Sequence, residues 1–289
     1  MHPILFHLGS FTVRSYGVLI VLGFSVGLWR AVKLLNKRSS QLPEGSPRRV
    51  SPDAMFDIGF YGLLLGMVGA RLAFVLLDWS DYAHNLLSAL EVWQGGLTVQ
   101  GGMAAGIIFM VWYCRRRKVN LACAADVAGV SFPLAYAIGR IGCLLNGCCY
   151  GAPTNLPWGI RFPSEEDPGT LTPPSHPIQL YATILNLIFF AILVKWEKKK
   201  RPDGELFWAY IAMYGAYRFA MEFLRIGATS SYDIPSLHLT YTQVFSALMV
   251  LAGVLGVKHV RKRCVWYNDN EVPTSPHATS GTIQASLPA

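Results

Sequence analysis

Long runs of apolar residues, separated by short polar or basic stretches, cover most of this chain. A helix needs about 20 mostly apolar residues to cross roughly 30 Å of hydrocarbon. Stretches of that kind predict seven membrane-spanning helices: Ser15 to Leu35, Ala54 to Leu77, Leu97 to Cys114, Leu121 to Leu145, Ile178 to Trp196, Glu205 to Leu224 and Thr240 to Val257. The sequence therefore predicts an all-α, polytopic membrane protein with no room for a separate soluble domain.

Three further stretches complete the predicted layout. Residues 1–14 form a short outer segment, and residues 147–177 form an outer connection too rich in proline to be a span. Residues 265–289 are rich in Ser, Thr and Pro, and we expect them to be a disordered cytoplasmic tail. Residues 1–264 are therefore predicted to form a single transmembrane domain.

Composition and charge placement agree with a lipid environment. Only 15% of the residues are charged, against roughly 25% in soluble domains. The net charge of +8 does not indicate a nucleic-acid partner, because its basic residues follow the first, third, fifth and seventh spans. The positive-inside bias then predicts an outer N-terminus and a cytoplasmic C-terminus, which requires an odd number of spans.

This orientation brings polar residues from five helices to one depth near the outer face. They are Tyr16, Arg71, Gln100, Arg140, Asn146, Tyr214, Arg218, Glu222 and Arg225. An intramembrane charge costs about 2.5–3.5 kcal/mol on insertion scales, so these groups must face one another or a ligand. The sequence thus predicts a polar site near the outer surface.

The sixth predicted span carries its polar residues on one stripe, because 100° per residue aligns Tyr214, Arg218, Glu222 and Arg225. Arg218 and Glu222, four residues apart, are expected to pair. One interpretation is an ion pair that only orients helices. The arginines outnumber the acids, however, and a guanidinium binds phosphate bidentately, which favours a phospholipid headgroup as the ligand.

The cysteines and histidines give weaker signals. Cys143, Cys148 and Cys149 lack zinc-knuckle spacing and have no His or Asp close in sequence, so packing or an outer disulfide is favoured over a metal site. His176 lies where the outer connection enters the fifth span, at the depth of the arginines. It is a candidate site residue, although a lone interfacial histidine is more often structural.

Several short motifs, in order along the seven spans, carry a resemblance to a known family. They are Ser15-Tyr16-Gly17, Gly69-Ala-Arg71, Gly95-Gly96 with Gly101-Gly102, Gly139-Arg140-Ile-Gly142 with Asn146-Gly147, Trp158-Gly159-Ile-Arg-Phe162-Pro163, His176-Pro177 with Gln179-Leu180-Tyr181, and Tyr214-Gly215-Ala-Tyr-Arg218 with Glu222-Phe-Leu-Arg225. Together they resemble the bacterial prolipoprotein diacylglyceryl transferases.

The resemblance implies an enzyme of the bacterial inner membrane, with its active site facing outward and no cofactor or metal. Its partners would be phosphatidylglycerol and the lipobox signal peptides of preprolipoproteins, and its products a lipidated cysteine and glycerol phosphate. It implies catalytic roles for Arg140, Arg218, Glu222, His176 and Tyr16. For substrate binding it implies Arg140, Asn146, Arg225, Gln100, Gly102, Tyr214 and Arg71.

The chain departs from the family pattern at several positions. Gln100 stands where many members have a histidine proposed as a base, and a glutamine accepts no proton near neutral pH. Cysteines stand at positions 143 and 148, where an Asn and an acid are usual, and Ala182 replaces a common acid. Our hypothesis is that arginines promote thiol ionisation without a dedicated base, with His176 and Glu222 as fallback bases.

Two other functions are compatible with parts of this pattern. A transporter would also bury charges in such a bundle, but it places them at the midplane between repeats, which this sequence does not show. A divergent family member with another acceptor, or with no activity, is motivated by Gln100.

Overall fold

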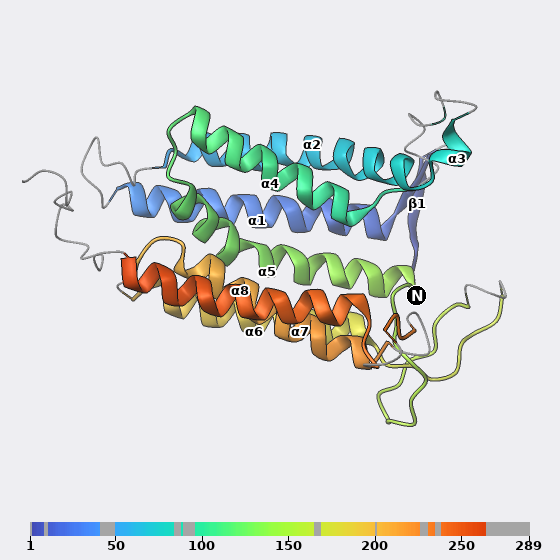
Figure 1. Cartoon of the computed structure of the whole chain (residues 1–289). Helices are drawn as coiled ribbons and strands as arrows, with labels where there is room; N and C mark the ends of the chain where they lie inside the picture. Colours follow the sequence, from blue (N-terminus) through green and yellow to red (C-terminus); the bar gives the residue numbers. More distant parts are fainter. Residues whose placement is uncertain are drawn as a thin grey trace, which may run out of the picture.

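The computed structural model describes residues 2–8, 11–40, 50–83, 88, 96–164, 169–199, 201–225, 231–234 and 238–263. Its long helices are α1 (Ser15–Ser39), α2 (Pro52–Leu77), α4 (Val99–Arg116), α5 (Leu121–Asn146), α6 (Ile178–Glu197), α7 (Glu205–Phe223) and α8 (Tyr241–Arg263). Each coincides with one predicted span, and successive long helices alternate in direction (Figure 1).

The helices are predominantly apolar, as a polytopic membrane protein requires. In the described part of the chain, α1, α2, α5, α6 and α8 are long and apolar enough to cross a membrane. Helix α4 ends in two arginines, and α7 carries Glu205, Arg218 and Glu222, which lowers the mean hydropathy of both helices.

The bundle is apolar on its surface and partly polar inside. Large apolar side chains such as Val68, Leu72 and Ile108 are more than half exposed. The buried polar side chains include Asp126, Gln179, Asn186, Glu205, Glu222 and Gln243. A lipid solvent favours this distribution, because polar groups in hydrocarbon must be satisfied by protein.

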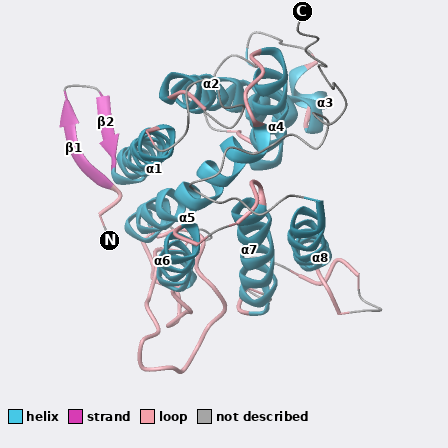
Figure 2. Ribbon diagram, turned by 90° about the vertical axis from the view of Figure 1, so that its left-hand side faces the viewer, coloured by secondary structure: helices cyan, strands magenta, loops and turns pink. Residues whose placement is uncertain are grey.

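Helix α5 is the central element of the bundle. It packs against α1, α4, α6 and α7, while α2 packs mainly on α4, and α8 mainly on α7 (Figure 2). Small residues permit the closest approaches: a Cβ atom at Gly23 of α1 would lie 2.7 Å from the carbonyl oxygen of Ala135 in α5. Helix α5 can therefore present side chains to several neighbours at once.

Side chains fix where several helices begin. The Ser51 side chain accepts a hydrogen bond from Ala54 N at 3.1 Å and precedes Pro52, and Asn120 caps α5 in the same way. Thr240 and Gln243 form a reciprocal capping box at α8, with distances of 3.0 and 3.1 Å. These caps satisfy backbone donors that have no partner within the helix.

Two small elements were not predicted. Strands β1 (Ile4–Leu8) and β2 (Phe11–Arg14) form an antiparallel hairpin within the predicted outer segment, and the short helix α3 (Trp79–Tyr82) follows α2. Ser15 anchors the hairpin, because its backbone N donates to the carbonyl of Pro3 at 3.0 Å. The predicted cytoplasmic tail at residues 265–289 lies outside the described residues.

Candidate functional site

Two arginines converge at one end of the central helix pair. Helices α5 and α7 run in the same direction, and the rings of Tyr136 and Tyr214 meet edge to face with centroids 5.7 Å apart. Arg140 lies four residues after Tyr136, and Arg218 lies four residues after Tyr214. Each arginine thus lies about one helical turn beyond the Tyr136–Tyr214 contact, so Arg140 and Arg218 are at the same height on neighbouring helices.

The guanidinium of Arg140 is oriented by tyrosine. Its Nε donates to the Tyr136 hydroxyl at 2.9 Å, and its Nη2 donates to the same oxygen. The Tyr136 hydroxyl also lies 3.5 Å from that of Tyr217 on α7. Among the described residues no carboxylate pairs with Arg140, so its charge is available to an anion that enters the site.

Aromatic side chains enclose the inner side of this arginine. They are Phe132 and Tyr136 from α5 and Tyr210, Tyr214 and Tyr217 from α7, with neighbouring ring centroids 5.7 to 6.4 Å apart. The Tyr136–Tyr214 and Tyr136–Tyr217 contacts are edge to face, a geometry that adds stabilisation beyond the area that the rings bury. The cluster therefore fixes α5 against α7 next to Arg140, whose guanidinium lies over the Tyr136 ring.

Arg218 forms the ion pair that the helical spacing predicts. Its Nη1 donates to Oε2 of Glu222 at 2.8 Å, which confirms that prediction. The Glu222 side chain is 3% exposed, and its other oxygen lies 3.5 Å from the Thr240 hydroxyl at the start of α8. The carboxylate therefore fixes Arg218 and joins α7 to α8.

Arg225 follows the end of α7 and shares this electrostatic environment. Burial lowers the pKa of Arg225, the positive charges of Arg218 and Arg140 lower it further, and Glu222 opposes them. Such mutual influence requires the three arginines to lie close together. Three cations and one buried carboxylate thus make this end of the bundle attractive to an anion.

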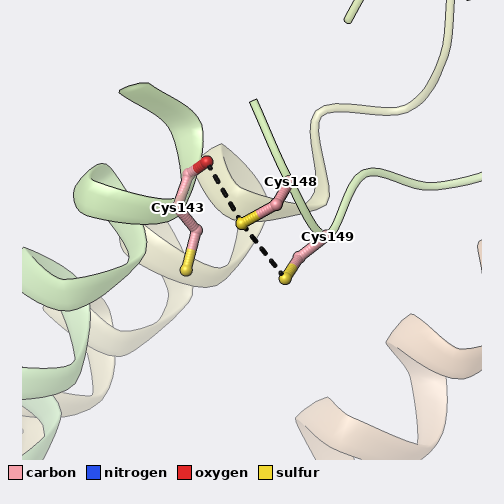
Figure 3. A group of neighbouring side chains, drawn as sticks. All are labelled: Cys143, Cys148 and Cys149. Atoms are coloured by element: carbon pink, nitrogen blue, oxygen red, sulfur yellow. Dashed lines mark hydrogen bonds between the residues drawn. The ribbon is translucent and has the colours of Figure 1, made fainter. Parts of the chain in front are cut away.

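The end of α5 brings three thiols beside the arginines. Gly147 adopts a left-handed conformation (φ 78°), and the N–H of Cys148 donates to the carbonyl of Cys143 at 3.2 Å. This Schellman motif turns the residue after the glycine back onto the last helical turn. As a result, Cys143, Cys148 and Cys149 cluster with all Sγ atoms within 4.8 Å of one another (Figure 3).

Other predicted residues border the thiol cluster. Tyr16 of α1 faces α5 beside Cys143, because a Cβ atom added at Gly142 would lie 3.5 Å from the Tyr16 ring. The Asn146 side chain interacts with Cys148. Tyr16, Asn146, Arg140, Arg218 and Arg225 therefore belong to one region, formed by α1, α5 and the end of α7.

The outer connection is tied to this region by its backbone. Gly151 N donates to the carbonyl of His176 at 2.9 Å, and Ala152 N donates to the carbonyl of Leu224 at 2.7 Å. The His176 ring lies 3.3 Å from the Tyr181 hydroxyl, which accepts a hydrogen bond from Trp158. His176 is thus held by an aromatic neighbour at the base of the connection.

Three predicted residues lie in the α2–α4 pair. Arg71 donates to the carbonyls of Gly96 and Ser88 at 3.1 and 2.8 Å, so it fixes the chain that enters α4. Gly102 faces α2, where an added Cβ atom would lie 3.1 Å from the Gly66 carbonyl oxygen. Gln100 is exposed. Arg71 also lies over the rings of Phe74 and Tyr82, so these contacts of Arg71 and Gly102 belong to the α2–α4 pair and the chain beside it.

Four residues that shape this site were not among the predicted site residues. Tyr136 orients Arg140, Tyr217 lies beside the Tyr136 hydroxyl, Thr240 contacts Glu222, and Gln179 donates to the Cys148 carbonyl at 2.6 Å. Tyr136 lies one turn before Arg140, so the helical-stripe argument used for α7 would have found it. Thr240 and Gln179 act from other helices and give no comparable signal in sequence.

Comparison with known proteins places the sequence of this chain in a family. A family model described as "Prolipoprotein diacylglyceryl transferase" matches residues 3–258. The chain is 33% identical over 263 residues to the phosphatidylglycerol–prolipoprotein diacylglyceryl transferase of Vibrio atlanticus, covering 90% of this chain and 91% of that protein. The protein of the same name from Geobacter sulfurreducens is 33% identical over 226 residues, covering 77% and 82% of the two chains.

Proposed function

The chain belongs to the prolipoprotein diacylglyceryl transferase family, and we propose that Arg140 and Arg218 hold the phosphate of its lipid substrate. The chain transfers the diacylglyceryl group of phosphatidylglycerol to a prolipoprotein, the reaction for which its relatives are named. In this proposal the acceptor is the thiol of the lipobox cysteine in the signal peptide of an exported precursor.

The proposed location is the outer face of the bacterial inner membrane. All seven long helices span the bilayer, with the N-terminus outside and the C-terminus in the cytoplasm. Support comes from charge placement: α1, α4 and α8 end in basic residues, whereas Arg140 and Arg218 lie toward the other end of the bundle. Basic ends favour the cytoplasmic side, and the site then meets the phospholipid headgroups of the outer leaflet.

The observation that carries the proposal is that Arg140 on α5 and Arg218 on α7 lie at the same height on neighbouring helices. In the part of the chain that the structure describes, Arg140 is bonded to a tyrosine hydroxyl and to no carboxylate, and Arg218 is fixed by Glu222 at 2.8 Å. A rigidly held guanidinium presents two parallel donors to a phosphate. Arg140 is the phosphate-binding residue in this proposal, Arg218 is the second cation, and Tyr16, Asn146 and Arg225 complete the binding region.

The reaction needs a nucleophile and a stabilised leaving group. The cysteine thiolate attacks the glycerol carbon that bears the phosphate ester, a C–S bond forms, and the C–O bond to phosphate breaks. The thioether product carries the diacylglyceryl group, and glycerol phosphate leaves with the bonding electrons. The phosphomonoester, whose second pKa is about 6, leaves largely as a dianion near neutral pH, and the proton lost by the thiol passes to solvent. Arginine stabilises charge on both the thiolate and the departing phosphate.

We propose that no side chain acts as an obligatory base. Gln100 accepts no proton near neutral pH, and Glu222 already bonds Arg218 and Thr240. The remaining candidate, His176, is held against Tyr181. A thiol with an ordinary pKa near 8.5 needs only a modest shift from nearby guanidinium groups to ionise at neutral pH.

A pH profile tests this part of the proposal. Below the pKa of the peptide thiol, the initial rate should rise about tenfold per pH unit, since only the thiolate reacts. The His176→Ala protein should show the same profile and a rate within about threefold of the parent. If the initial rate of the parent instead showed a pH transition with a midpoint near 6.5, and this transition were absent in His176→Ala, histidine would be identified as the base.

The arginine proposal is tested with purified protein, labelled phosphatidylglycerol and a lipobox peptide. Arg140→Lys and Arg218→Lys should each reduce lipidated peptide by more than about 100-fold, since lysine keeps the charge but loses the planar fork. Arg116→Lys, at the other end of the bundle, is the matched control and should retain full activity. Wild-type transfer by both site variants would contradict the proposal, and lipid movement without product would indicate a carrier.

A further inference from the structure

The thiol cluster at the end of α5 is a site that the transfer reaction does not use. We propose that Cys143, Cys148 and Cys149 bind one soft, thiophilic metal cation, either Cu⁺ or Zn²⁺ (Figure 3). The sequence around the three cysteines lacks the His or Asp that would complete a tetrahedral zinc site. The structure brings together three sulfur donors instead, which is a different ligand set.

The backbone brings these sulfurs together without help from a metal. In a Schellman motif the residue after the left-handed glycine contacts the residue three positions before the helix cap, and here these are Cys148 and Cys143. Cys149 has a positive φ of 65°, a conformation that L-residues seldom adopt. The Gln179 side chain, fully buried, holds the Cys148 carbonyl at 2.6 Å. The ligand loop is therefore preorganised.

The sulfur separations fit a three-coordinate metal. A metal–sulfur bond of about 2.3 Å in trigonal geometry places the sulfurs about 4 Å apart. The Cys148 and Cys149 sulfurs are 3.5 Å apart, and all three lie within 4.8 Å. Sulfur movements of less than about 1 Å would complete the site. Thiolate ligands select Cu⁺ and Zn²⁺ over harder cations such as Mg²⁺ and Ca²⁺.

A cation lies beside the thiol cluster, because Arg140 precedes Cys143 by three residues and shares one face of α5 with it. Thiol ligands lose their protons when a metal binds, so a nearby positive charge is compatible with the thiolate ligands of the loaded site. Cys143 is buried, whereas Cys148 and Cys149 are partly exposed. An ion can reach the site from one side and retain an open coordination position there.

Metal titration of the full-length protein in lipid nanodiscs tests the proposal. The protein is reduced, freed of reductant without oxygen, and shown by thiol titration to carry its six cysteines as free thiols. One titration uses competition with a Cu⁺ chelator and the other uses competition with a Zn²⁺ indicator. Each should show binding of one equivalent of metal per chain, and the ion with the higher affinity is the one that the site prefers. With Cd²⁺ as a probe, sulfur-to-metal charge-transfer absorption should report three thiolates.

Variants decide whether the cluster is the site. Cys143→Ser should weaken metal binding by more than about 100-fold, beyond the 10–100-fold cost of losing an outer-shell partner. Cys114→Ala, buried in α4, is the matched control and should bind as the parent does. Equal binding by a folded Cys143→Ser/Cys148→Ser/Cys149→Ser protein, or no binding by the reduced parent, would overturn the proposal. These readouts are independent of transferase activity.

Discussion

At the scale of single residues, the candidate site depends on how each arginine is held. Arg218 has a carboxylate four residues away on its own helix, which a spacing argument identifies. Arg140 has a phenol in the equivalent direction, one turn earlier on α5. A phenol orients a guanidinium without neutralising it. Of the two arginines, Arg218 is therefore neutralised by a carboxylate and Arg140 is bonded to a neutral phenol, so Arg140 has the greater capacity to bind phosphate.

The Tyr136 hydroxyl gives a direct test of this orientation. Tyr136→Phe keeps the ring contact with Tyr214 at 5.7 Å but removes the oxygen that accepts two hydrogen bonds from Arg140. A hydrogen bond to a charged group contributes about 1.5–3 kcal/mol, so kcat/KM for transfer should fall about 10- to 100-fold. The measurement is peptide lipidation at limiting phosphatidylglycerol.

Tyr61→Phe provides the control for that substitution. Tyr61 lies on α2 with 49% of its surface exposed, away from Arg140, and should tolerate loss of its hydroxyl. Unchanged kcat/KM in a folded Tyr136→Phe protein would show that the phenol does not orient the arginine for catalysis.

The Glu222 carboxylate is predicted to contribute to both stability and transfer. In Glu222→Gln, the Arg218 ion pair at 2.8 Å is lost while the Thr240 contact at 3.5 Å can remain. Leaving a buried charge without its partner costs about 3–5 kcal/mol. The thermal unfolding midpoint in detergent should therefore fall clearly, and transfer should fall with it. An unchanged midpoint would mean that Arg218 finds another partner.

At the scale of helices, apolar run length was sufficient to predict every long helix. Capping residues such as Ser51 and Asn120 lie where the runs begin, so local chemistry and hydropathy agree. The β1–β2 hairpin was not predicted, because β2 has only four residues and β1 carries three consecutive apolar residues, Ile4, Leu5 and Phe6, which are all about half exposed. Such a surface suits the membrane interface and gives no period-two signal.

Glycine contacts between α2 and α4 provide a prediction at this scale. A Cβ atom at Gly101 would lie 2.5 Å from the Gly69 carbonyl oxygen and closer still to the Cβ of Ala73. Gly101→Ala should therefore separate the helices and cost about 1–3 kcal/mol, the typical range for overpacking. Thermal unfolding in detergent should show a lower midpoint.

Gly106→Ala is the matched control on the same interface. Its added Cβ atom would lie 3.7 Å from the Gly62 carbonyl oxygen, which is ordinary van der Waals contact. The midpoint of this variant should stay close to that of the parent. Equal losses in both variants would show that helix propensity or solvation, and not the close approach, determines the effect.

At the scale of the whole molecule, the sequence predicted that Tyr16, Arg140 and Arg218 lie toward one end of the bundle, but it did not predict their neighbours on other helices. The alternation of helix directions brings Tyr16, Arg140 and Arg218 to one end, as topology alone requires. The central position of α5, and the separation of Arg71 into the α2–α4 pair, depend on interhelical packing. Packing is decided by contacts between residues distant in sequence, which hydropathy does not encode.

The basic end of the bundle is also where buried ion pairs join the helices. Arg201 pairs with Asp126 at 2.6 Å, and Arg30 pairs with Glu197 at 2.8 Å. Arg261 pairs with the buried Glu205. These contacts connect α1 with α6, the α6–α7 connection with α5, and α8 with α7. One end of the molecule is therefore cross-linked by three such pairs, whereas at the other end Arg218 pairs with Glu222 and Arg140 is bonded to a phenol.

This asymmetry supports a prediction about membrane orientation. One epitope tag is inserted at Asn155 in the outer connection, and a second is fused to the C-terminus. In intact spheroplasts, antibody should reach only the tag at Asn155, and after permeabilisation it should reach both. The reason is that translocating the basic ends of α1, α4 and α8 is disfavoured, while the connection carries little basic charge. A C-terminal tag that is accessible before permeabilisation would invert the bundle, and it would move Arg140 and Arg218 to the leaflet from which exported precursors do not present their cysteines.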